Sequence, residues 1–289
     1  MSARLFVFGL GYSAGLLARE LLAAGWRVAG TTRDAAKADR LRRDGIETFL
    51  FGRTQPLDPA ALAGTTHLLS SIAPDAAGDP VLDLHGADLR ALGLRLSGYL
   101  STTGVYGDAG GAWVDEDSPL NPTHERSTRR AAVEQEWLGS GLPAEIYRLA
   151  GIYGPGRNQL EDVLAGTARH VVKPGQVFSR IHGEDIAGGV AAAIARPASG
   201  RVLNFADDEP ASNADVLLEA CRLLGVEPPP PVPFEQAKVR MSEMALSFWA
   251  DNRRVSNRRL RQELGYALRY PTYREGLRAC RAALPASPR

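Results

Sequence analysis

Residues 4–15 read RLFVFGLGYSAG, and this stretch decides the fold. A short apolar run leads directly into a turn that contains Gly9 and Gly11, and a stretch with leucines at helical spacing then continues to Gly25. A strand, a glycine turn and a helix in this order form the context in which a G-x-G-x-x-[GA] pattern indicates a dinucleotide site. Gly9 suits the tight turn, Gly11 lets the backbone approach a pyrophosphate, and the small Ala14 lets the helix pack closely on the strand.

The glycine pattern alone also fits an ordinary tight turn between a strand and a helix. The apolar strand before it and the amphipathic helix after it favour the dinucleotide interpretation. Free N–H groups at the start of a helix, together with the positive end of its dipole, favour phosphate binding. In this turn we expect the cofactor to contact Gly9, Leu10, Gly11, Tyr12, Ser13 and Ala14.

The end of the second expected strand, residues 27–32, narrows the choice of cofactor. This strand ends in Thr32 and Arg33, and an acidic residue follows only at Asp34. NAD sites usually place a carboxylate there to accept from the ribose 2′-OH, whereas an arginine accommodates the 2′-phosphate of NADP. The sequence therefore favours NADP over NAD, with Thr32 and Arg33 as contacts. A simpler interpretation is that Arg33 is solvated and Asp34 caps a helix over residues 35–43.

The composition is that of an ordinary enzyme-sized protein. The chain has 289 residues and a formal net charge of +1, so no overall field points to a nucleic-acid or membrane partner. No apolar run approaches the ~20 residues of a membrane-spanning helix. The N-terminus carries no leader pattern, and we expect a cytoplasmic protein. Cys221 and Cys280 form no Cys-x-x-Cys pair and no Cys/His cluster, so we expect reduced cysteines and no metal site.

Strands and helices alternate along the chain, which indicates a parallel sheet. Further strands are expected at residues 46–51, 66–72, 98–102, 144–149 and 201–205, and further helices at 127–138, 185–195 and 213–224. We therefore expect an α/β fold with a Rossmann-type doubly wound parallel sheet in a domain of residues 1–208. Residues 209–289 are expected to form a small C-terminal substrate cap at the carboxyl edge of the sheet, to which part of 151–182 could belong.

Four further motifs resemble those of one enzyme superfamily. They read LSTTGVYGD over residues 100–108, YRLAGIYGPG over 147–156, FSRIHGEDIA over 178–187 and LNFA over 203–206. In order and spacing they resemble the extended short-chain dehydrogenase/reductase superfamily, the NAD-dependent epimerase/dehydratase family. With the glycine turn, the resemblance covers most of residues 1–208. It implies further cofactor contacts at Ser71, Ile72, Ala73, Thr102, Arg130 and Leu149.

The chain departs from the family at the residues that transfer protons. Members carry a Ser or Thr at the end of the fifth strand and a Tyr-x-x-x-Lys on the next helix. Thr102 matches the first position, but the Tyr and Lys positions fall on Arg126 and Arg130, and residues 118–136 contain no tyrosine or lysine. Arg130 could replace the lysine as a fixed cation. Arg126 cannot replace the tyrosine, because a guanidinium stays protonated in proteins.

A proton donor must therefore lie elsewhere, and Tyr106, Tyr153, His182 and a bound water are the candidates. We take Thr102, Tyr106 and Arg130 as the expected catalytic residues. Both tyrosines lie at positions where aromatic residues commonly pack, and His182 also fits a buried structural role. Asp185 is expected to cap the helix at 185–195.

Two further departures concern the substrate. Members that use sugar nucleotides tend to carry an asparagine where this chain has Gly151 and an arginine where it has Phe178. A small, anionic carbonyl or alcohol is therefore the expected substrate, with Thr103, Arg126, Arg180 and His182 as contacts and Arg157 as a further cation. Residues 248–254 read FWADNRR and could line a pocket, although a helix that packs its aromatic residues into the cap is the simpler interpretation.

Two classes of function fit these features. The first is an NADP(H)-dependent oxidoreductase or epimerase-like enzyme with a non-standard proton donor. The second is a regulatory protein that binds NAD(P) without turnover, as atypical members of the superfamily are thought to do. Retained Thr102 and the cap favour the enzyme. The resemblance also leaves a homodimer open.

Overall fold

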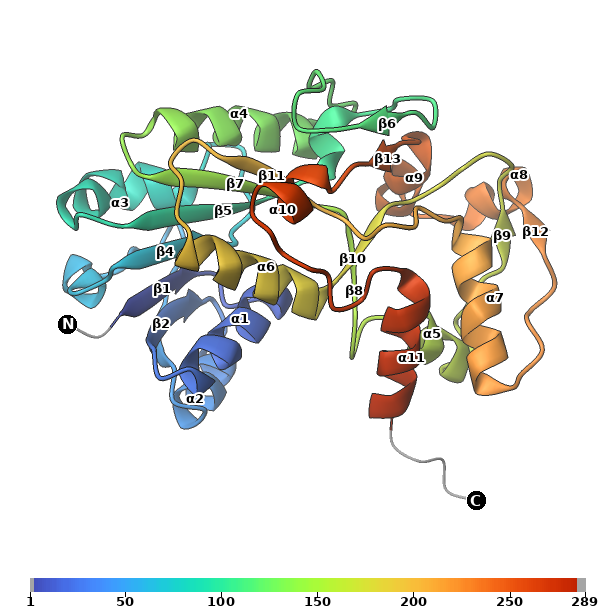
Figure 1. The fold of residues 1–289 in the computed structure, drawn as a ribbon, viewed down its shortest axis with the longest axis horizontal. Coiled ribbons are helices and arrows are strands. Elements are labelled where there is room, and N and C mark those ends of the chain that lie inside the picture. The colour runs from blue at the N-terminus through green and yellow to red at the C-terminus, as the bar shows by residue number, and fades with distance from the viewer. Residues whose placement is uncertain (1–2, 285–289) are drawn as a thin grey trace.

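The computed structural model describes residues 3–284, and a seven-stranded parallel sheet forms its centre (Figure 1). The strand order is β11-β7-β5-β4-β1-β2-β3. The strands are β1 (Arg4–Phe8), β2 (Arg27–Thr32), β3 (Glu47–Leu50), β4 (His67–Ser70), β5 (Leu96–Thr102), β7 (Ala144–Leu149) and β11 (Val202–Phe205). This order, which runs outward in both directions from the first strand, is that of the doubly wound Rossmann fold. The expected fold class is confirmed.

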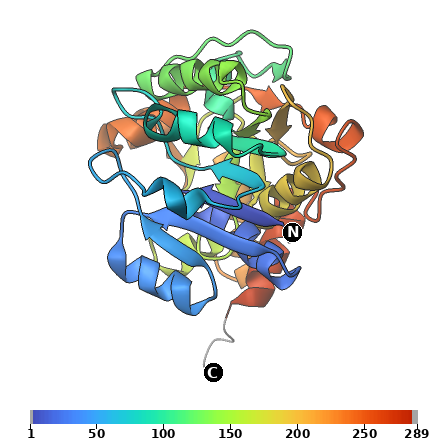
Figure 2. The same ribbon diagram turned by 90° about the vertical axis from the view of Figure 1, so that its left-hand side faces the viewer.

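Helices cover both faces of the sheet (Figures 1 and 2). One layer contains α1 (Tyr12–Ala23), α2 (Ala35–Arg43) and α6 (Gly183–Ala195), and the other contains α3 (Pro80–Ala91) and α4 (Glu125–Gly139). All five residues of β1 are buried, with Leu5 and Val7 in the core of the first layer and Phe6 and Phe8 in that of the second. Successive side chains of a strand point to opposite faces, so a strand covered on both sides is apolar throughout.

Several expected elements agree closely with the structure, although the helices expected at 127–138 and 185–195 each begin two residues earlier. The strands at residues 4–8, 27–32 and 144–149 and the helices at 35–43 and 213–224 have the expected bounds. Helix α3 was not among the expected elements, although Asp79 caps its start by accepting from the N–H groups of Val81 and Leu82, and Pro80 is its first residue. No helix within residues 3–284 combines the length and the apolar character needed to cross a bilayer.

A smaller group of elements, which we call the cap, lies beyond the carboxyl ends of the strands, at the right of Figure 1. It includes α5 (Gln159–Leu164), α7 (Asn213–Leu224), α8 (Phe234–Ala237), η3 (Lys238–Arg240), α9 (Glu243–Ala250) and α11 (Tyr273–Ala283). Two short parallel sheets join these helices, one from β8 (Gly151–Tyr153) and β10 (Arg180–His182), the other from β9 (Val171–Val172) and β12 (Val232–Pro233). Leu160, Val216 and Leu277 centre an apolar core between α5, α7 and α11.

The chain returns to the main body between the last two of these helices. There β13 (Arg254–Val255) pairs with β6 (Trp113–Val114), and α10 (Arg258–Gln262) packs near β11. Beyond α10, three donors converge on the buried carboxylate of Asp185: the Tyr266 hydroxyl at 2.9 Å and the backbone N–H groups of Arg269 and Tyr270 at 2.6 and 3.0 Å.

The expectation that Asp185 caps α6 is wrong. The N-cap residue is His182, whose ring Nδ1 accepts from the Glu184 N–H at 3.2 Å. Asp185 lies within the first turn, and its carboxylate is already occupied by the donors from the later segment. The physical reason is that α6 begins at Gly183, two residues before the expected start, so Asp185 lies inside the helix and the residue that precedes the helix is His182.

Candidate functional site

The glycine turn between β1 and α1 has the backbone geometry that a bound phosphate needs. Gly9 has a φ of +87°, which favours glycine, and its N–H donates to Thr31 Oγ1 at 2.9 Å. Gly11 is the N-cap residue of α1, and no side chain caps this helix. Its first N–H groups are therefore available to an anion, in the field of the helix dipole.

The end of β4 lies against this turn. A Cβ atom on Gly9 would lie 2.9 Å from Ile72 Cγ1, and one on Gly11 would lie 4.0 Å from Ser71 Oγ. The structure thus brings together two groups of expected cofactor contacts, the glycine turn and the loop of Ser71, Ile72 and Ala73.

At the end of β2, Asp34 caps α2 by accepting from the Lys37 N–H at 3.0 Å. The capping interpretation of Asp34 is confirmed. Arg33 is exposed, which fits both the simpler interpretation that it is solvated and its expected contact with a 2′-phosphate.

Tyr12 connects the glycine turn to a second loop. Its hydroxyl donates to the carbonyl oxygen of Pro155 at 3.1 Å. Side chains larger than glycine would not fit beside it, since a Cβ atom on Gly154 would lie 2.4 Å from that hydroxyl and one on Gly183 would lie 2.7 Å from its ring. Burial raises the pKa of Tyr12 to about 12.

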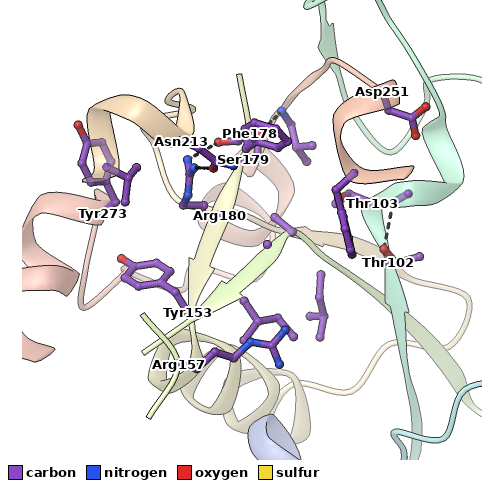
Figure 3. A pocket seen from close by; sticks show the side chains of 18 of the residues that line it. Thr102, Thr103, Tyr153, Arg157, Phe178, Ser179, Arg180, Asn213, Asp251 and Tyr273 are labelled. Atoms are coloured by element: carbon purple, nitrogen blue, oxygen red, sulfur yellow. Dashed lines mark hydrogen bonds between the residues drawn. The ribbon is translucent and has the colours of Figure 1, made fainter. Parts of the chain in front are cut away.

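A cavity of about 710 Å³ begins at the end of β5 and continues beneath the cap (Figure 3). Residues from the sheet edge, from the start of α4 and from the cap line it together. The expected site residues that line it are Thr102, Thr103, Arg126, Leu149, Tyr153, Arg157 and Arg180. Three other expected residues, Tyr106, Arg130 and His182, do not line it.

Two hydroxyl groups flank Gly104 at the sheet side of the cavity. A Cβ atom on this glycine would lie 2.8 Å from Ser127 Oγ and 3.3 Å from Thr102 Oγ1. Thr102 Oγ1 accepts from the Gly104 N–H at 3.1 Å, which leaves its O–H to donate elsewhere. Ser127, in the first turn of α4, also lines the cavity. Ser127 was not among the expected site residues, although its place one residue after Arg126 was a usable signal.

Tyr106 belongs to a buried polar network. Its hydroxyl donates to Asn204 Oδ1 at 2.7 Å and accepts from Arg148 at 2.9 Å. Burial raises its pKa to about 12. The Arg148 guanidinium in turn pairs with Glu134 at 2.7 Å, and Ser101 Oγ donates to Glu134 Oε1 at 2.5 Å. This network adjoins the end of β5, because Ser101 directly precedes Thr102.

Arg130 lies on the second turn of α4. One of its terminal nitrogens donates to the Leu100 carbonyl oxygen at 2.5 Å, and the guanidinium lies 5.6 Å from the centre of the Tyr99 ring. The Arg130 guanidinium is therefore held against the backbone of β5.

His182 is buried between aromatic rings. Its ring centre lies 4.1 Å from that of Tyr270 and 5.2 Å from that of Tyr153, and burial lowers its pKa. The structure thus gives His182 a packing and capping position outside the cavity.

Arg180, by contrast, is buried in the cavity wall. Its guanidinium donates to the carbonyl oxygens of Phe178 and Ala211 at 2.9 and 2.8 Å and to Asn213 Oδ1 at 2.6 Å. Burial lowers the pKa of Arg180. These bonds fix the wall formed by β10 against the start of α7 (Figure 3).

The mouth of the cavity combines cations with an aromatic ring. The Arg126 guanidinium lies 5.1 Å from the centre of the Phe248 ring, and Phe248 is 58% exposed. Trp249 is buried and packs edge-on against Phe178 at 5.2 Å. Residues 248–254 thus fit both interpretations in part. Trp249 packs into the cap, as the simpler interpretation expects, and Phe248 lines the cavity, as the pocket interpretation expects.

His124, Asp251 and Arg253 also line the cavity. Asp251 and Arg253 belong to the segment 248–254 that was expected to be able to line a pocket, whereas His124 was not expected there. Asp251 is held by the Thr123 hydroxyl at 2.6 Å and by Arg253 at 3.0 Å. Asp251 lies 127 positions after His124, so only the tertiary fold shows that the two are neighbours.

Comparisons with known proteins identify the family. No protein-family model matches the chain. A solved structure from Methylobacillus flagellatus, assigned to the NAD-dependent epimerases/dehydratases, has a TM-score of 0.72 at 25% identity and covers 98% of both chains. Protein YeeZ of Escherichia coli (strain K12) is 32% identical over 243 residues, 77% of this chain and 84% of YeeZ. The chain belongs to the NAD-dependent epimerase/dehydratase family.

Two further proteins share most of this chain. A conserved protein of unknown function from Silicibacter pomeroyi DSS has a TM-score of 0.91 at 47% identity, with 97% of this chain and 99% of that chain covered. A 3-diazoavenalumate denitrifying reductase from a Streptomyces species is 32% identical over 200 residues, 65% of this chain and 66% of the reductase. The resemblance seen in the sequence motifs is thus confirmed at the level of the family.

Proposed function

We propose that this member of the family is an NADP(H)-dependent oxidoreductase that acts on a small carbonyl or alcohol with an anionic group. The observation that carries the proposal is the cavity of about 710 Å³ that starts at Thr102, at the carboxyl edge of the sheet. Doubly wound sheets bind their ligands at this edge, and the volume suits a small organic molecule. The 32% identity to a reductase supports a redox reaction.

The residues around the glycine turn fit a dinucleotide. Uncapped N–H groups at the start of α1 would bind the pyrophosphate, and the exposed Arg33 guanidinium would bind a 2′-phosphate. When bound, the nicotinamide supplies or accepts the hydride. The Thr102 hydroxyl would donate to the substrate oxygen and hold it in place.

The charges at the mouth support an anionic substrate. Arg126 and Arg157 line the cavity, both are exposed, and within residues 3–284 neither forms an ion pair. An unpaired guanidinium on an aromatic face is well placed to bind a carboxylate or phosphate.

The test is a titration of the purified protein with NADPH and NADH, followed by turnover. A panel of aldehydes and ketones, each with and without a carboxylate, is then added while the nicotinamide absorbance is followed. We expect NADPH to bind more tightly than NADH and the carboxylate-bearing carbonyls to be reduced. Tight binding with a silent panel would instead favour a cofactor-sensing protein, and no binding of either nucleotide would refute the assignment of the glycine turn.

A further inference from the structure

The reduction of a carbonyl needs an acid, and most expected donors are unsuitable. Arg126 and Arg130 stay protonated, so they cannot give up a proton in the reaction. Tyr106 and His182 lie outside the cavity. Tyr153 lines the cavity, but its hydroxyl faces the Thr272 carbonyl oxygen at 3.4 Å, and burial raises its pKa far above the usual range.

One further residue that lines the cavity with Thr102 is a histidine, His124. Histidine is the side chain whose ordinary charge change falls between pH ~5 and ~8. His124 is the N-cap residue of α4, and its backbone carbonyl accepts from the N–H groups of Ser127 and Thr128 at 2.8 and 2.9 Å. The imidazole itself does not cap the helix, so no ring nitrogen is used in capping.

The two nitrogens of this ring have different surroundings. Nε2 is enclosed by the protein and lies 4.0 Å from Asp251 Oδ1. The His124 side chain is nevertheless 31% exposed, which leaves Nδ1 as the nitrogen available to a substrate. Catalytic hydrogen bonds are often long before the substrate binds and shorten in the complex.

The carboxylate of Asp251 is held in place by hydrogen bonds to both of its oxygens. It is only 8% exposed, and its two carboxylate oxygens accept from the Thr123 hydroxyl and from Arg253. A buried carboxylate beside an imidazole holds its orientation and stabilises the imidazolium form, as in other acid–base sites.

We propose that His124, oriented by Asp251, is the acid that gives the proton to the carbonyl oxygen held at Thr102. This inference rests on the proposed function, which supplies the nicotinamide hydride. The hydride forms a C–H bond at the carbonyl carbon, the C=O π electrons move to the oxygen, and the oxygen takes the proton from Nδ1. The imidazolium becomes a neutral imidazole, the dinucleotide is oxidised, and solvent returns the proton. Alcohol oxidation runs the same steps in reverse.

Other charged groups face the same space. Asp251 and Arg253 come from the segment after α9, and Arg126 from α4 itself. Across the cavity are Arg157, Glu161, Asp162 and Arg180, where α5 and β10 form the wall. The two acids on α5 belong to the cap, whereas His124 is the N-cap residue of α4, whose first turn carries Ser127; the hydroxyls of Ser127 and Thr102 flank Gly104.

The experiment compares the wild type with His124→Gln and Asp251→Asn. His170→Gln is the matched control, since His170 bonds to the Pro229 carbonyl oxygen outside the cavity. kcat/KM for a carboxylate-bearing carbonyl is measured with NADPH between about pH 5 and 9, the range in which an imidazole titrates. NADPH affinity is measured separately by fluorescence titration, and the imidazole signals of the cofactor-free proteins are followed by NMR.

We expect the wild-type rate to fall as pH rises, because the donor must be protonated. His124→Gln should lose about 100-fold in kcat/KM together with this pH dependence, a usual loss for a general acid. In Asp251→Asn, the fall in rate and the titration of the His124 NMR signal should both move to lower pH, because the anion that stabilises the imidazolium is gone. NADPH affinity and the control should match the wild type.

Two results would overturn the assignment. In the first, His124→Gln keeps the wild-type rate and pH profile. In the second, the His124 signal titrates at the same pH in Asp251→Asn as in the wild type. A wild type that reduces no carbonyl refutes the proposed function itself, so the two failures are distinguishable.

Discussion

Replacing Glu134 by glutamine should destabilise the protein far more than its conservative chemistry implies. Glu134 on α4 is 0% exposed and pairs with Arg148 on β7, which is also buried. Glutamine keeps the shape and one acceptor oxygen, but it leaves the guanidinium buried without a counter-ion. Breaking one partner of a buried pair typically costs about 3–5 kcal/mol, because an uncompensated charge remains.

The hydrogen bonds of Glu134 place the expected loss of unfolding free energy within this range. The Glu134 carboxylate accepts from Arg148 Nε at 3.1 Å and from its terminal nitrogen at 2.7 Å, and the Ser101 hydroxyl adds a third donor. Arg148 keeps one partner, the Tyr106 hydroxyl, so the lower half of the range is expected, about 3 kcal/mol. A domain is stable by only about 5–15 kcal/mol, so the loss is easily measured.

The assay is urea unfolding followed by circular dichroism, with Glu125→Gln as the matched control. Glu125 lies on the same helix and also pairs with an arginine, Arg129, but the pair is exposed and should change the free energy of unfolding little. A loss below about 1 kcal/mol for Glu134→Gln would refute the reasoning, because it would mean that the Arg148 charge is not desolvated.

Four further results are expected. Arg33→Ala should weaken NADPH binding about 10- to 100-fold, as expected for loss of a charged hydrogen-bond donor to phosphate, and leave NADH binding unchanged; fluorescence titration measures both. Thr102→Ala should abolish carbonyl reduction in a steady-state assay and leave NADPH affinity nearly intact. Arg126→Gln should raise KM about 10-fold for carboxylate-bearing substrates, as expected for loss of a charge-assisted hydrogen bond, and leave the KM of their neutral analogues unchanged. Burial lowers the pKa of His67 below its unfolded value near 6.5, so the unfolded state takes up a proton at a higher pH than the folded state does. The free energy of unfolding, measured by urea unfolding, should therefore fall as pH drops from about 7.5 to 5.5. This fall should be smaller in His67→Gln.

Each of these predictions has a contradicting outcome. Arg40→Ala, on the exposed face of α2, is the control for Arg33→Ala, and equal weakening of NADPH and NADH by the latter would remove the 2′-phosphate assignment. Loss of NADPH binding in Thr102→Ala would make that residue a cofactor contact rather than a catalytic one. Equal KM changes for charged and neutral substrates would separate Arg126 from anion recognition. An unchanged pH dependence in His67→Gln would mean that other groups cause it.

Local sequence patterns predict the core of this fold well. The glycine turn and the strands at residues 4–8 and 27–32 are encoded by neighbours, because apolar runs and turn residues act over a few positions. The same holds for Asp34, whose capping role follows from its place before a helix. Thr102 could be placed at the cavity for the same reason, since a strand end at the carboxyl edge is a local feature.

The rest of the site depends on contacts that sequence spacing does not reveal. His124 and Asp251 meet because β13 returns to pair with β6, and short paired segments leave little periodic signal. Arg130 was placed at the site by family position, and Tyr106 was a candidate proton donor. Asn204 and Arg148 take up the Tyr106 hydroxyl, and the Leu100 carbonyl oxygen accepts from one terminal nitrogen of Arg130. Such pairings are tertiary and can be identified only once the helices and strands are packed.

The three donors that meet Asp185 have a consequence for synthesis on the ribosome. Tyr266, Arg269 and Tyr270 emerge 81 to 85 residues after the carboxylate that they bind. Until then the surface of α6 at Gly188, against which Tyr266 packs, has no cover. A nascent chain that already carries the complete seven-stranded sheet therefore still exposes a charged group and an apolar groove. Chaperone engagement should be strongest in that interval and end once Tyr266, Arg269 and Tyr270 have left the exit tunnel.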